Sequence, residues 1–178
     1  MDSKNGLVIW ITGLSGAGKT TISKKVFAAL RAQDRACILL DGDEIRTAFS
    51  TALHGHDEKS RRAIALGYSG LAKILADQGN LVIVATMALF HEVHSWNREN
   101  FPQYIEVFID VSMNILKERD SKGLYAKAAK HLISNVAGVD ITYEAPKHPD
   151  IILDNSKNIE NTNKLAEEII KMITIKLK

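Results

Sequence analysis

The sequence predicts an α/β fold of three layers, in which helices cover both faces of a doubly wound parallel sheet of about five strands. Short apolar runs at 7–12, 36–40, 81–86 and 104–111 are rich in β-branched and aromatic residues. The first three are almost continuously hydrophobic, as strands are when helices cover both faces of a parallel sheet. The segments between the runs read as helices, and this alternation indicates parallel crossover connections.

The elements follow in order along the chain. The strand at 7–12 leads through a glycine-rich turn into a segment whose apolar residues recur at helical spacing, which predicts an amphipathic helix. Residues 58–77 favour a second helix, and Gly79 is placed to end it. A fifth strand is expected at 151–153. The tail at 159–177 carries one apolar stripe and is expected to pack back on the sheet.

Length and composition favour one domain that spans residues 1–178. With 46% hydrophobic and 25% charged residues, a chain of 178 residues can bury a substantial core. No internal repeat, low-complexity block or Pro/Gly-rich linker divides it. Residues 119–148 break the alternation of strands and helices and mix basic residues with Pro146, and Pro149 follows directly after them, so we expect a mobile lid there.

The charge balance limits the classes of partner. The formal net charge is +2, from 23 basic and 21 acidic residues, so no general positive field exists to bind nucleic acid or a membrane surface. Cys37 is the single cysteine, which suits a reducing compartment and a place in the core. No signal peptide or membrane-length apolar run is present, and we expect a soluble cytoplasmic protein.

The segment GLSGAGKTT, residues 13–21, carries the main functional signal. It satisfies the pattern G-x-x-x-x-G-K-[ST] between a strand and a helix, the context in which this pattern predicts a phosphate-binding loop. Glycines allow successive N–H groups to face a phosphate, and the helix N-terminus adds a positive dipole end. Lys19 is expected to reach the β and γ phosphates of a nucleoside triphosphate, and Thr20 to bind Mg²⁺. The alternative is a glycine-rich turn without a ligand.

Two carboxylates follow the second strand in LLDGDEIR. Asp41 and Asp43 are expected at the C-terminal edge of the sheet, where doubly wound folds bind their ligands. They can orient magnesium-bound water or accept a proton from an attacking hydroxyl. The alternative is that they only cap the next helix. Asp110, at the end of the fourth strand, is either the acidic residue of a Walker B strand or an aspartate without a metal role.

The remaining motifs favour a small-molecule kinase among phosphate-loop proteins. The chain has neither the guanine-reading Asn-Lys-x-Asp element of a GTPase nor a recognisable switch region. Arg119, Lys122 and Lys127 in the expected lid can stabilise a phosphoryl group during transfer. The alternative for these lysines is a solvated basic helix.

The motifs together resemble those of the adenylylsulfate kinases, ATP-dependent enzymes that phosphorylate the 3′-hydroxyl of adenylylsulfate. The likeness lies in GLSGAGKTT, LDGDEIR, LADQG followed by LVIVAT, IEVFIDV, ERDSKGLYAKA and GVDITYEAPKHPDIILDN. It spans nearly the whole chain in the family's order. The resemblance implies a P-loop kinase fold with ATP in the glycine loop, a second nucleotide between the DGD edge and the lid, and a homodimer.

The resemblance also implies roles for individual residues. Lys19, Asp43 and Lys122 would be catalytic, with Asp43 approaching the acceptor hydroxyl, and Thr20 and Asp43 would hold the metal. The implied ATP site consists of Gly13, Ser15, Gly16, Ala17, Gly18, Lys19, Thr20, Thr21, Arg119 and Pro146. The implied acceptor site consists of Asp41, Asp43, Arg46, Arg61, Lys122, Gly123 and Leu124, with the two arginines on the acceptor's phosphate-linked end.

Departures from the family gather in the acceptor pocket. Where the family usually reads D-R-x-E-N-I-R-R, this chain has SRRAIALG at 60–67, and the family's S-F-I-S-P-Y-R becomes ATMALFH at 85–91. His56 and Val136 replace two phenylalanines that clamp the acceptor's adenine in the family. Tyr68 and Phe90 either supply new aromatic surface or belong to the core.

The sequence leaves open where His91 and His94 lie, and three functions fit its motifs. His91 and His94 on a predicted helix either line the pocket or lie on the surface, and a metal site would need further ligands. The first function, and the one we expect, is an ATP-dependent kinase that transfers the γ-phosphoryl group to the 3′-hydroxyl of adenylylsulfate. The second is a kinase for another nucleotide, such as cytidine diphosphoramidate in capsule biosynthesis, since a smaller pyrimidine tolerates a pocket without the double phenylalanine clamp. The third is a non-catalytic nucleotide-binding module.

Overall fold

The computed structural model describes residues 6–49, 55, 57–120, 122–157 and 161–177. Its centre is a five-stranded parallel sheet in the order β2-β3-β1-β4-β5, which confirms the predicted fold class. The strands are β1 (Leu7–Thr12), β2 (Cys37–Asp41), β3 (Leu81–Ala85), β4 (Tyr104–Asp110) and β5 (Ile151–Asp154).

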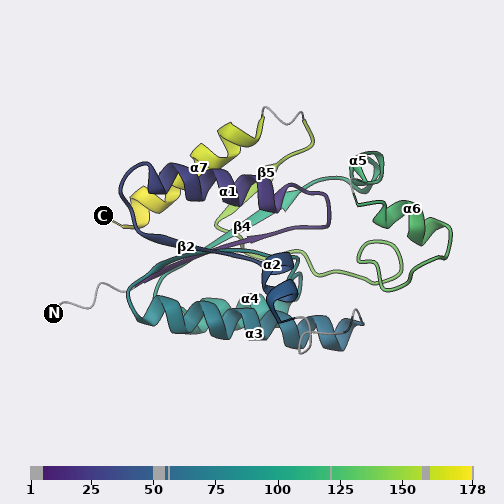
Figure 1. Ribbon diagram of the computed structural model, residues 1–178, viewed down its shortest axis with the longest axis horizontal. Helices are drawn as coiled ribbons and strands as arrows, with labels where there is room; N and C mark the ends of the chain where they lie inside the picture. Colours follow the sequence, from purple (N-terminus) through teal and green to yellow (C-terminus); the bar gives the residue numbers. More distant parts are fainter. Residues whose placement is uncertain (1–5, 50–54, 56, 121, 158–160, 178) are drawn as a thin grey trace.

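Helices lie on both faces of the sheet, and a further group lies beyond one end of it (Figure 1). The helices α1 (Lys19–Arg31) and α7 (Asn161–Lys176) cover one face, and α3 (Glu58–Asp77) and α4 (His91–Asn100) cover the other. The short helices are α2 (Gly42–Ala48), α5 (Met113–Arg119) and α6 (Leu124–Ala129). Among the described helices, none is long and apolar enough to cross a membrane.

The alternation of side chains along β1 explains the two cores. Leu7, Ile9 and Ile11 belong to the apolar cluster under α1 and α7, whereas Val8 and Trp10 belong to the cluster under α3 and α4. Every residue of β1 is buried because both faces of this central strand are covered. This explains why the strand reads as a continuous hydrophobic run in the sequence.

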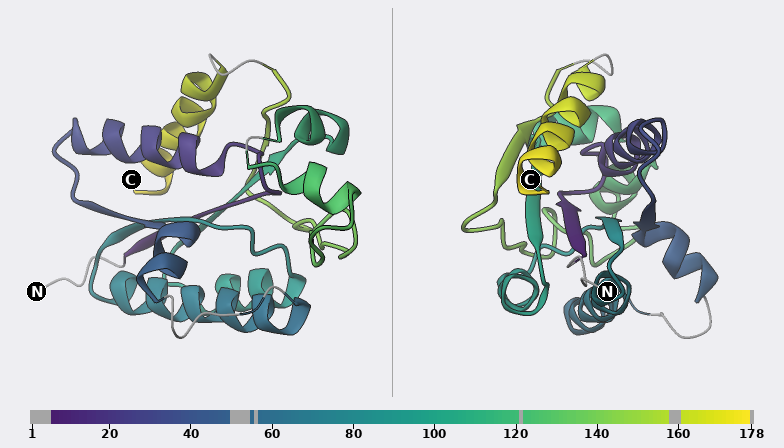
Figure 2. Two further views of the ribbon diagram at one scale, coloured as in Figure 1. Left: turned by 45° about the vertical axis from the view of Figure 1, so that its right-hand side comes forward. Right: turned by 90° about the vertical axis from the view of Figure 1, so that its left-hand side faces the viewer.

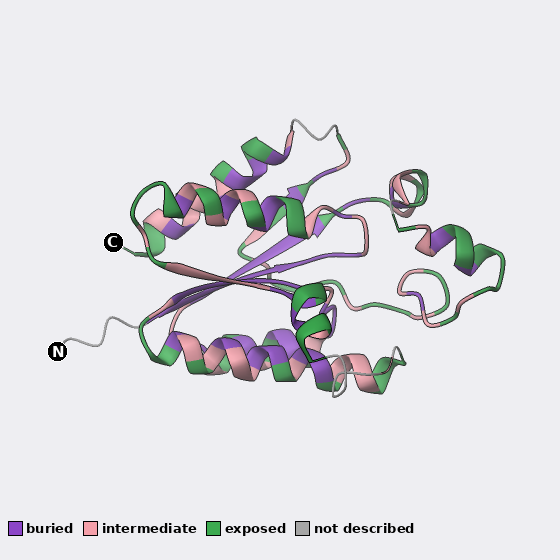
Figure 3. Ribbon diagram, in the orientation of Figure 1, coloured by how far each residue is buried: buried purple, intermediate pink, exposed green. Residues whose placement is uncertain are grey.

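All strands run parallel, so their carboxyl ends meet at one edge of the sheet. Figure 2 shows α5 and α6 beyond this edge, close to the loop that joins β1 to α1. The buried residues of Figure 3 follow the sheet and the inner sides of its covering helices, while α6 is exposed on much of its surface. The fold thus leaves the carboxyl edge as the place where loops from several strands converge.

The segment expected to form a lid has two parts in the structure. Its first part holds α6, which lies beyond the sheet edge, and the Tyr125 hydroxyl of α6 donates to the carbonyl of Ser15 at 2.9 Å. The later part runs back along the molecule, where the Glu144 N–H donates to the Leu89 carbonyl at 3.0 Å and the Arg98 guanidinium donates to the His148 carbonyl at 2.9 Å. These two bonds tie the later part to the body of the protein. Mobility of the segment stays a prediction.

Candidate active site

The glycine-rich loop turns sharply between β1 and α1. Gly18 is the N-cap of α1 and has a φ of 100°, a left-handed conformation that strains any residue with a Cβ. A Cβ at Gly18 would lie 2.5 Å from the amide nitrogen of Asn155, which itself donates to the Ala17 carbonyl at 2.8 Å. The loop therefore fits against the end of β5 only because residue 18 is glycine.

Lys19 follows the loop and lies half-buried in the cleft beside it. Its ammonium group donates to the Leu14 carbonyl at 2.9 Å, which folds the side chain back over the loop. Desolvation by the surrounding protein lowers the pKa of Lys19 to about 8, and the neighbouring Asp43 carboxylate opposes part of this shift. A bound phosphate would add negative charge beside this ammonium group and favour its charged form.

Asp41 joins the ends of two elements. One carboxylate oxygen accepts from the Thr20 hydroxyl at 2.7 Å, and the other accepts from the N–H groups of Asp43 and Glu44 at 2.9 and 3.4 Å. The side chain is only 3% exposed, so these bonds satisfy a buried charge. Asp41 thus caps α2, as the structural alternative predicted, and also reaches the hydroxyl predicted to bind a metal ion.

Asp43 lies one residue inside α2 and faces the start of α6. Its carboxylate accepts from the Lys122 ammonium group at 2.5 Å. This hydrogen bond is the main reason why the pKa of Asp43 is lowered, with Lys19 and Arg46 adding smaller effects of the same sign. Asp43 is therefore ionised at neutral pH.

Two arginines come together on the same side of the cleft. A guanidinium nitrogen of Arg46 donates to the Gly55 carbonyl at 3.2 Å, and one of Arg61 donates to the Asn135 carbonyl at 2.7 Å. Burial lowers the pKa of Arg61, and the positive charge of Arg46 lowers it further. Two adjacent cations in a partly buried site favour an anion between them.

These residues surround one cleft of about 500 Å³. Tyr68 and Phe90 line it with their rings while packing in the core beneath α3 and α4, so the two interpretations of these rings are both partly right. The Arg62 guanidinium lies 4.7 Å from the centre of the Phe90 ring, and the Tyr68 hydroxyl donates to the Gly42 carbonyl at 3.0 Å. The rings are thereby fixed in place.

The structure brings most of the predicted site residues together around the cleft. Those that line it are Ser15, Gly16, Gly18, Lys19, Thr20, Thr21, Asp41, Asp43, Arg46, Arg61, Lys122 and Leu124. The residues Gly13, Ala17, Arg119, Gly123 and Pro146 are not among those that line it. Arg119 donates to the Lys157 carbonyl at 2.8 Å, and Gly123 is the left-handed N-cap of α6.

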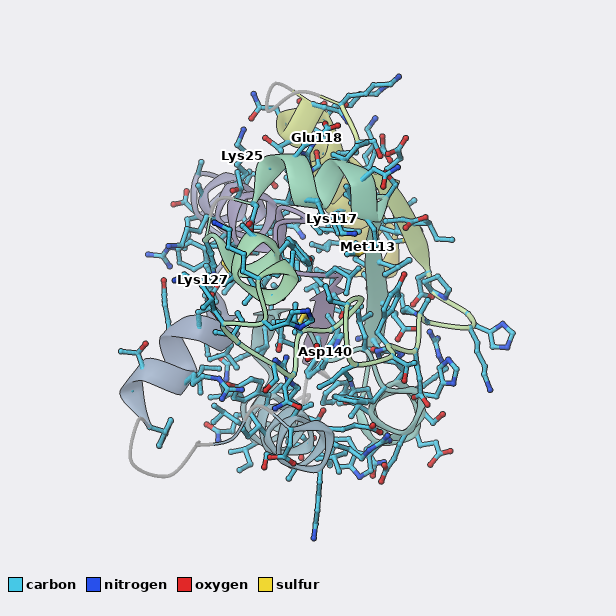
Figure 4. The ribbon with its side chains drawn as sticks, turned by 90° about the vertical axis from the view of Figure 1, so that its right-hand side faces the viewer. Lys25, Met113, Lys117, Glu118, Lys127 and Asp140 are labelled. Atoms are coloured by element: carbon cyan, nitrogen blue, oxygen red, sulfur yellow. The ribbon has the colours of Figure 1, made fainter. Side chains whose placement is uncertain are left out.

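Figure 4 looks onto the end of the molecule that carries α5 and α6, with Lys127 labelled on the latter. Lys127 is exposed and is also not among the residues that line the cleft, which agrees with the solvated alternative for this lysine. Asp110 is exposed at the end of β4, and the Thr20 hydroxyl contacts Asp41 instead.

Part of the wall of the cleft comes from two segments that the sequence indicated only as departures from the family, without assigning their residues to the site. Ile64 and Ala65 of α3 and the segment 85–88 also line it. The segment 85–88 lies at the carboxyl end of β3, so the rule that singled out Asp41 and Asp43 after β2 applies equally to it. Its residues carry no charge, and the pattern offered no chemical signal.

Two expectations about the acceptor pocket have structural answers, and a third lies outside the described residues. Val136 is 2% exposed, belongs to the core cluster that includes α1 and α7 residues, and is not among the residues that line the cleft, so it does not replace a ring there. His94 is buried, and neither it nor His91 lines the cleft. His56 lies outside the described residues. Among the described residues, no group of His, Cys, Asp and Glu side chains is arranged to hold a metal ion by itself.

The chain matches known proteins along nearly its whole length. A profile of the adenylylsulphate kinase family matches residues 5–154. The chain is 39% identical over 171 residues to a cytidine diphosphoramidate kinase of Campylobacter jejuni, covering 96% of this chain and 98% of that protein. It is 41% identical over 149 residues to an adenylyl-sulfate kinase of Pseudomonas aeruginosa, covering 83% and 76% of the two chains.

A solved structure with bound nucleotides shows the same fold. The Mycobacterium tuberculosis APS kinase CysC in complex with AMPPNP and APS aligns with a TM-score of 0.87 at 32% identity, over 96% of this chain and 98% of that one. The agreement extends from the glycine loop to the end of the sheet. With a family profile over most of its length and relatives near 40% identity, this chain belongs to the adenylylsulfate kinase family.

Proposed function

We propose that the chain is an ATP-dependent kinase that transfers the γ-phosphoryl group to the 3′-hydroxyl of a nucleotide, with cytidine diphosphoramidate as its acceptor. The observation that carries the proposal is the cleft itself, in which the phosphate loop, two carboxylates and a pair of arginines face one space of about 500 Å³. A binding module would need the loop but not the carboxylates and the lid lysine.

The phosphate loop and Lys19 would hold the triphosphate. Main-chain N–H groups at the start of α1 and the Lys19 ammonium group would neutralise the β and γ phosphates. The Thr20 hydroxyl and the Asp41 and Asp43 carboxylates offer the oxygen ligands that Mg²⁺ prefers, and Thr20 and Asp41 are already 2.7 Å apart. When bound there, Mg²⁺ would offset charge on the phosphate oxygens.

Asp43 and Lys122 would act at the acceptor hydroxyl. Asp43 is ionised, so its carboxylate can accept the hydrogen bond of the attacking hydroxyl and orient the oxygen toward the γ-phosphorus. As the bond to phosphorus forms, the proton passes to this carboxylate and the bond to the ADP oxygen breaks. Before this transfer, Lys122 would move from Asp43 to the phosphoryl group, where its charge stabilises the transition state.

Arg46 and Arg61 would hold the acceptor's diphosphate-like end. Their guanidinium groups are anchored by the carbonyls of Gly55 and Asn135, so little side-chain freedom remains to be lost on binding. Guanidinium groups suit phosphate oxygens because they offer several N–H donors in one plane. This end carries negative charge in both candidate acceptors.

The base pocket favours a cytidine nucleotide over adenylylsulfate. Val136 is in the core, so the clamp that the family uses for adenine lacks one ring here. Tyr68 and Phe90 are the aromatic residues that line the cleft among the described residues, and a smaller pyrimidine tolerates a pocket without the double clamp. A relative that is 39% identical over 171 residues is named for cytidine diphosphoramidate. Adenylylsulfate is the second candidate, because the aligned M. tuberculosis enzyme binds APS.

A coupled assay of ADP release tests the proposal. The purified chain is given ATP and Mg²⁺ with cytidine diphosphoramidate, adenylylsulfate, CMP or AMP, and kcat/KM is measured for each. We expect the highest kcat/KM for cytidine diphosphoramidate and a 3′-phosphate in the product by ³¹P NMR. A higher kcat/KM for adenylylsulfate would assign adenylylsulfate as the acceptor. If no ADP is released with any of the four compounds, both candidate acceptors are rejected.

The homodimer is proposed on the family resemblance alone. Light scattering coupled to size-exclusion chromatography tests it, with a mass of twice the chain expected. A monomer that retains full activity would reject it.

A further inference from the structure

The wall of the cleft that follows β3 is short and has few hydrogen bonds of its own. Residues 86–90 connect β3 to α4, and Met87, Ala88 and Phe90 line the cleft. Within this connection, the Leu89 N–H donates to the Met87 carbonyl at 2.9 Å. Other groups hold the connection from outside: the Thr86 N–H donates to the Ile11 carbonyl at 3.1 Å, and the Glu144 N–H donates to the Leu89 carbonyl at 3.0 Å. One further outside group contacts the Ala88 carbonyl.

That group is His94 on α4. Its Nε2 lies 2.6 Å from the Ala88 carbonyl oxygen, and because a carbonyl only accepts, Nε2 carries the proton. The imidazole is 6% exposed, so this bond forms away from competing water. Within the described residues, the other ring nitrogen, Nδ1, is buried without a hydrogen-bond partner.

The neighbours of His94 explain why it has only this one bond. Glu106 on β4 places a carboxylate oxygen 3.6 Å from Nδ1. The same carboxylate already accepts from the Tyr104 hydroxyl at 3.2 Å and from Arg98 at 3.1 Å. The negative charge of Glu106 is therefore already stabilised by Tyr104 and Arg98, without a hydrogen bond from His94. A leucine would fill the site of His94 without an unpaired nitrogen, so packing alone gives no reason for an imidazole there.

From this geometry we propose that His94 is a positioning residue for the acceptor side of the cleft. By holding the Ala88 carbonyl, next to the Leu89 carbonyl that Glu144 holds, it sets the course of the chain into Phe90, and hence the wall against which the acceptor's base lies. The glycine loop is held by other residues, since Asn155 donates to Ala17 and Tyr125 donates to Ser15. His94 therefore acts on acceptor binding and not on ATP binding. The inference rests on the proposed function only in placing the acceptor at this wall.

Four variants test the role of the Nε2 donor. His94→Gln keeps an N–H at nearly the position of Nε2, His94→Asn places its N–H near Nδ1 instead, and His94→Leu has none. Asn97→Leu is the matched control, because Asn97 is also buried on α4 but bonds to Tyr104 at 3.5 Å and not to the connection. For each variant, KM for ATP, KM for the acceptor and kcat are measured separately with cytidine diphosphoramidate and with adenylylsulfate.

The expected pattern separates positioning from general damage. His94→Leu and His94→Asn should raise acceptor KM about tenfold or more, with ATP KM changed less than about twofold, since small displacements at a site are costly. His94→Gln should restore most of the acceptor affinity, and Asn97→Leu should leave both KM values unchanged. If His94→Leu does not fold, the acceptor KM of His94→Gln compared with that of His94→Asn decides whether the Nε2 donor positions the acceptor side.

Two outcomes would overturn the inference. One is that His94→Gln and His94→Asn behave alike, and the other is that ATP KM rises as much as acceptor KM. Failure of the proposed function is distinguishable, because it concerns which acceptor the unmodified chain prefers. The pattern among variants can be read with whichever acceptor the chain phosphorylates.

Discussion

Lys122 and Asp43 form an ion pair across the mouth of the cleft, with 2.5 Å between the ammonium nitrogen and the carboxylate oxygen. The pair joins the turn before α6 to the start of α2, and its side chains are 62% and 71% exposed. Such an exposed pair adds little to stability. Its importance is that it holds a lid cation beside the carboxylate proposed to receive the acceptor's proton.

Replacing Lys122 should change chemistry without changing stability. In Lys122→Met, loss of the hydrogen bond should raise the pKa of Asp43 toward its usual range, so the acid limb of the kcat/KM profile should move to higher pH. Loss of the cation should lower kcat by about 100-fold. The unfolding free energy, measured by urea denaturation, should change by less than about 1 kcal/mol. Lys127→Met, on the exposed side of α6, is the control and should retain wild-type rates.

Asp41 should separate a structural role from a chemical one. Asp41→Ala removes the cap of α2 and should lower the unfolding free energy by about 1 kcal/mol or more, and it should also abolish activity. Asp41→Asn keeps one oxygen to accept from the Asp43 N–H, so stability should stay closer to wild type while the Mg²⁺ concentration for half-maximal rate rises steeply. A fully active Asp41→Asn protein would leave Asp41 with the capping role alone.

Val136→Phe tests whether the family's aromatic clamp can be restored by a single substitution. Val136 is 2% exposed in the core, so a phenylalanine there should overpack it and lower the unfolding free energy by about 1 to 3 kcal/mol. Adenylylsulfate should gain no affinity. Chemical denaturation and acceptor KM measure the two effects, and a stable variant with tighter adenylylsulfate binding would show that residue 136 faces the cleft.

Lys19 should couple ATP binding to proton uptake. Its pKa of about 8 in the ligand-free protein means that it loses its charge as pH rises above 8, whereas a bound phosphate favours the charged form. ATP affinity should therefore fall by up to about tenfold per pH unit above pH 8, with about one proton taken up on binding. Calorimetry in buffers of different ionisation enthalpy measures this uptake. Lys19→Arg, whose guanidinium stays charged, should bind ATP without it, and equal uptake by both proteins would exclude Lys19 as its source.

The fold and the phosphate side of the site were predictable because their signals are local. Strand β1 is a continuous apolar run, the glycine pattern follows it directly, and Asp41 and Asp43 come at the end of the next strand. In each case the residue type and its immediate neighbours carry the information. A parallel sheet then brings all these strand ends to one edge.

The contacts that fix the cleft were not predictable, since they join segments far apart in sequence. Asn155 contacts the glycine loop across 138 positions, and Glu144 bonds to the chain beside Phe90 across more than 50. Apolar runs do not reveal the strand order that creates such neighbours. Whether Val136 faces the cleft or the core likewise depends on the course of the chain after α6, for which its valine side chain gives no signal.

His94 should make the protein less stable below pH 6.5. Burial lowers the pKa of His94 from its ordinary value of 6.5. The negative charges of Glu106 on β4 and of Glu144 oppose this shift, whereas His91 favours it. Arg98, which bonds to Glu106, adds a further positive charge nearby. The unfolded chain therefore binds more protons than the folded one between the lowered pKa and 6.5, and unfolding free energy falls as pH falls through this window, by at most about 1.4 kcal/mol per pH unit. Thermal unfolding of wild type and His94→Gln between pH 5 and 7.5 measures the difference, in which the other histidines cancel. The difference in unfolding temperature between wild type and His94→Gln should narrow, or reverse in favour of His94→Gln, as the pH falls. If the unfolding temperatures of the two proteins instead depend on pH in parallel, His94 takes up its proton equally readily in the folded and the unfolded chain.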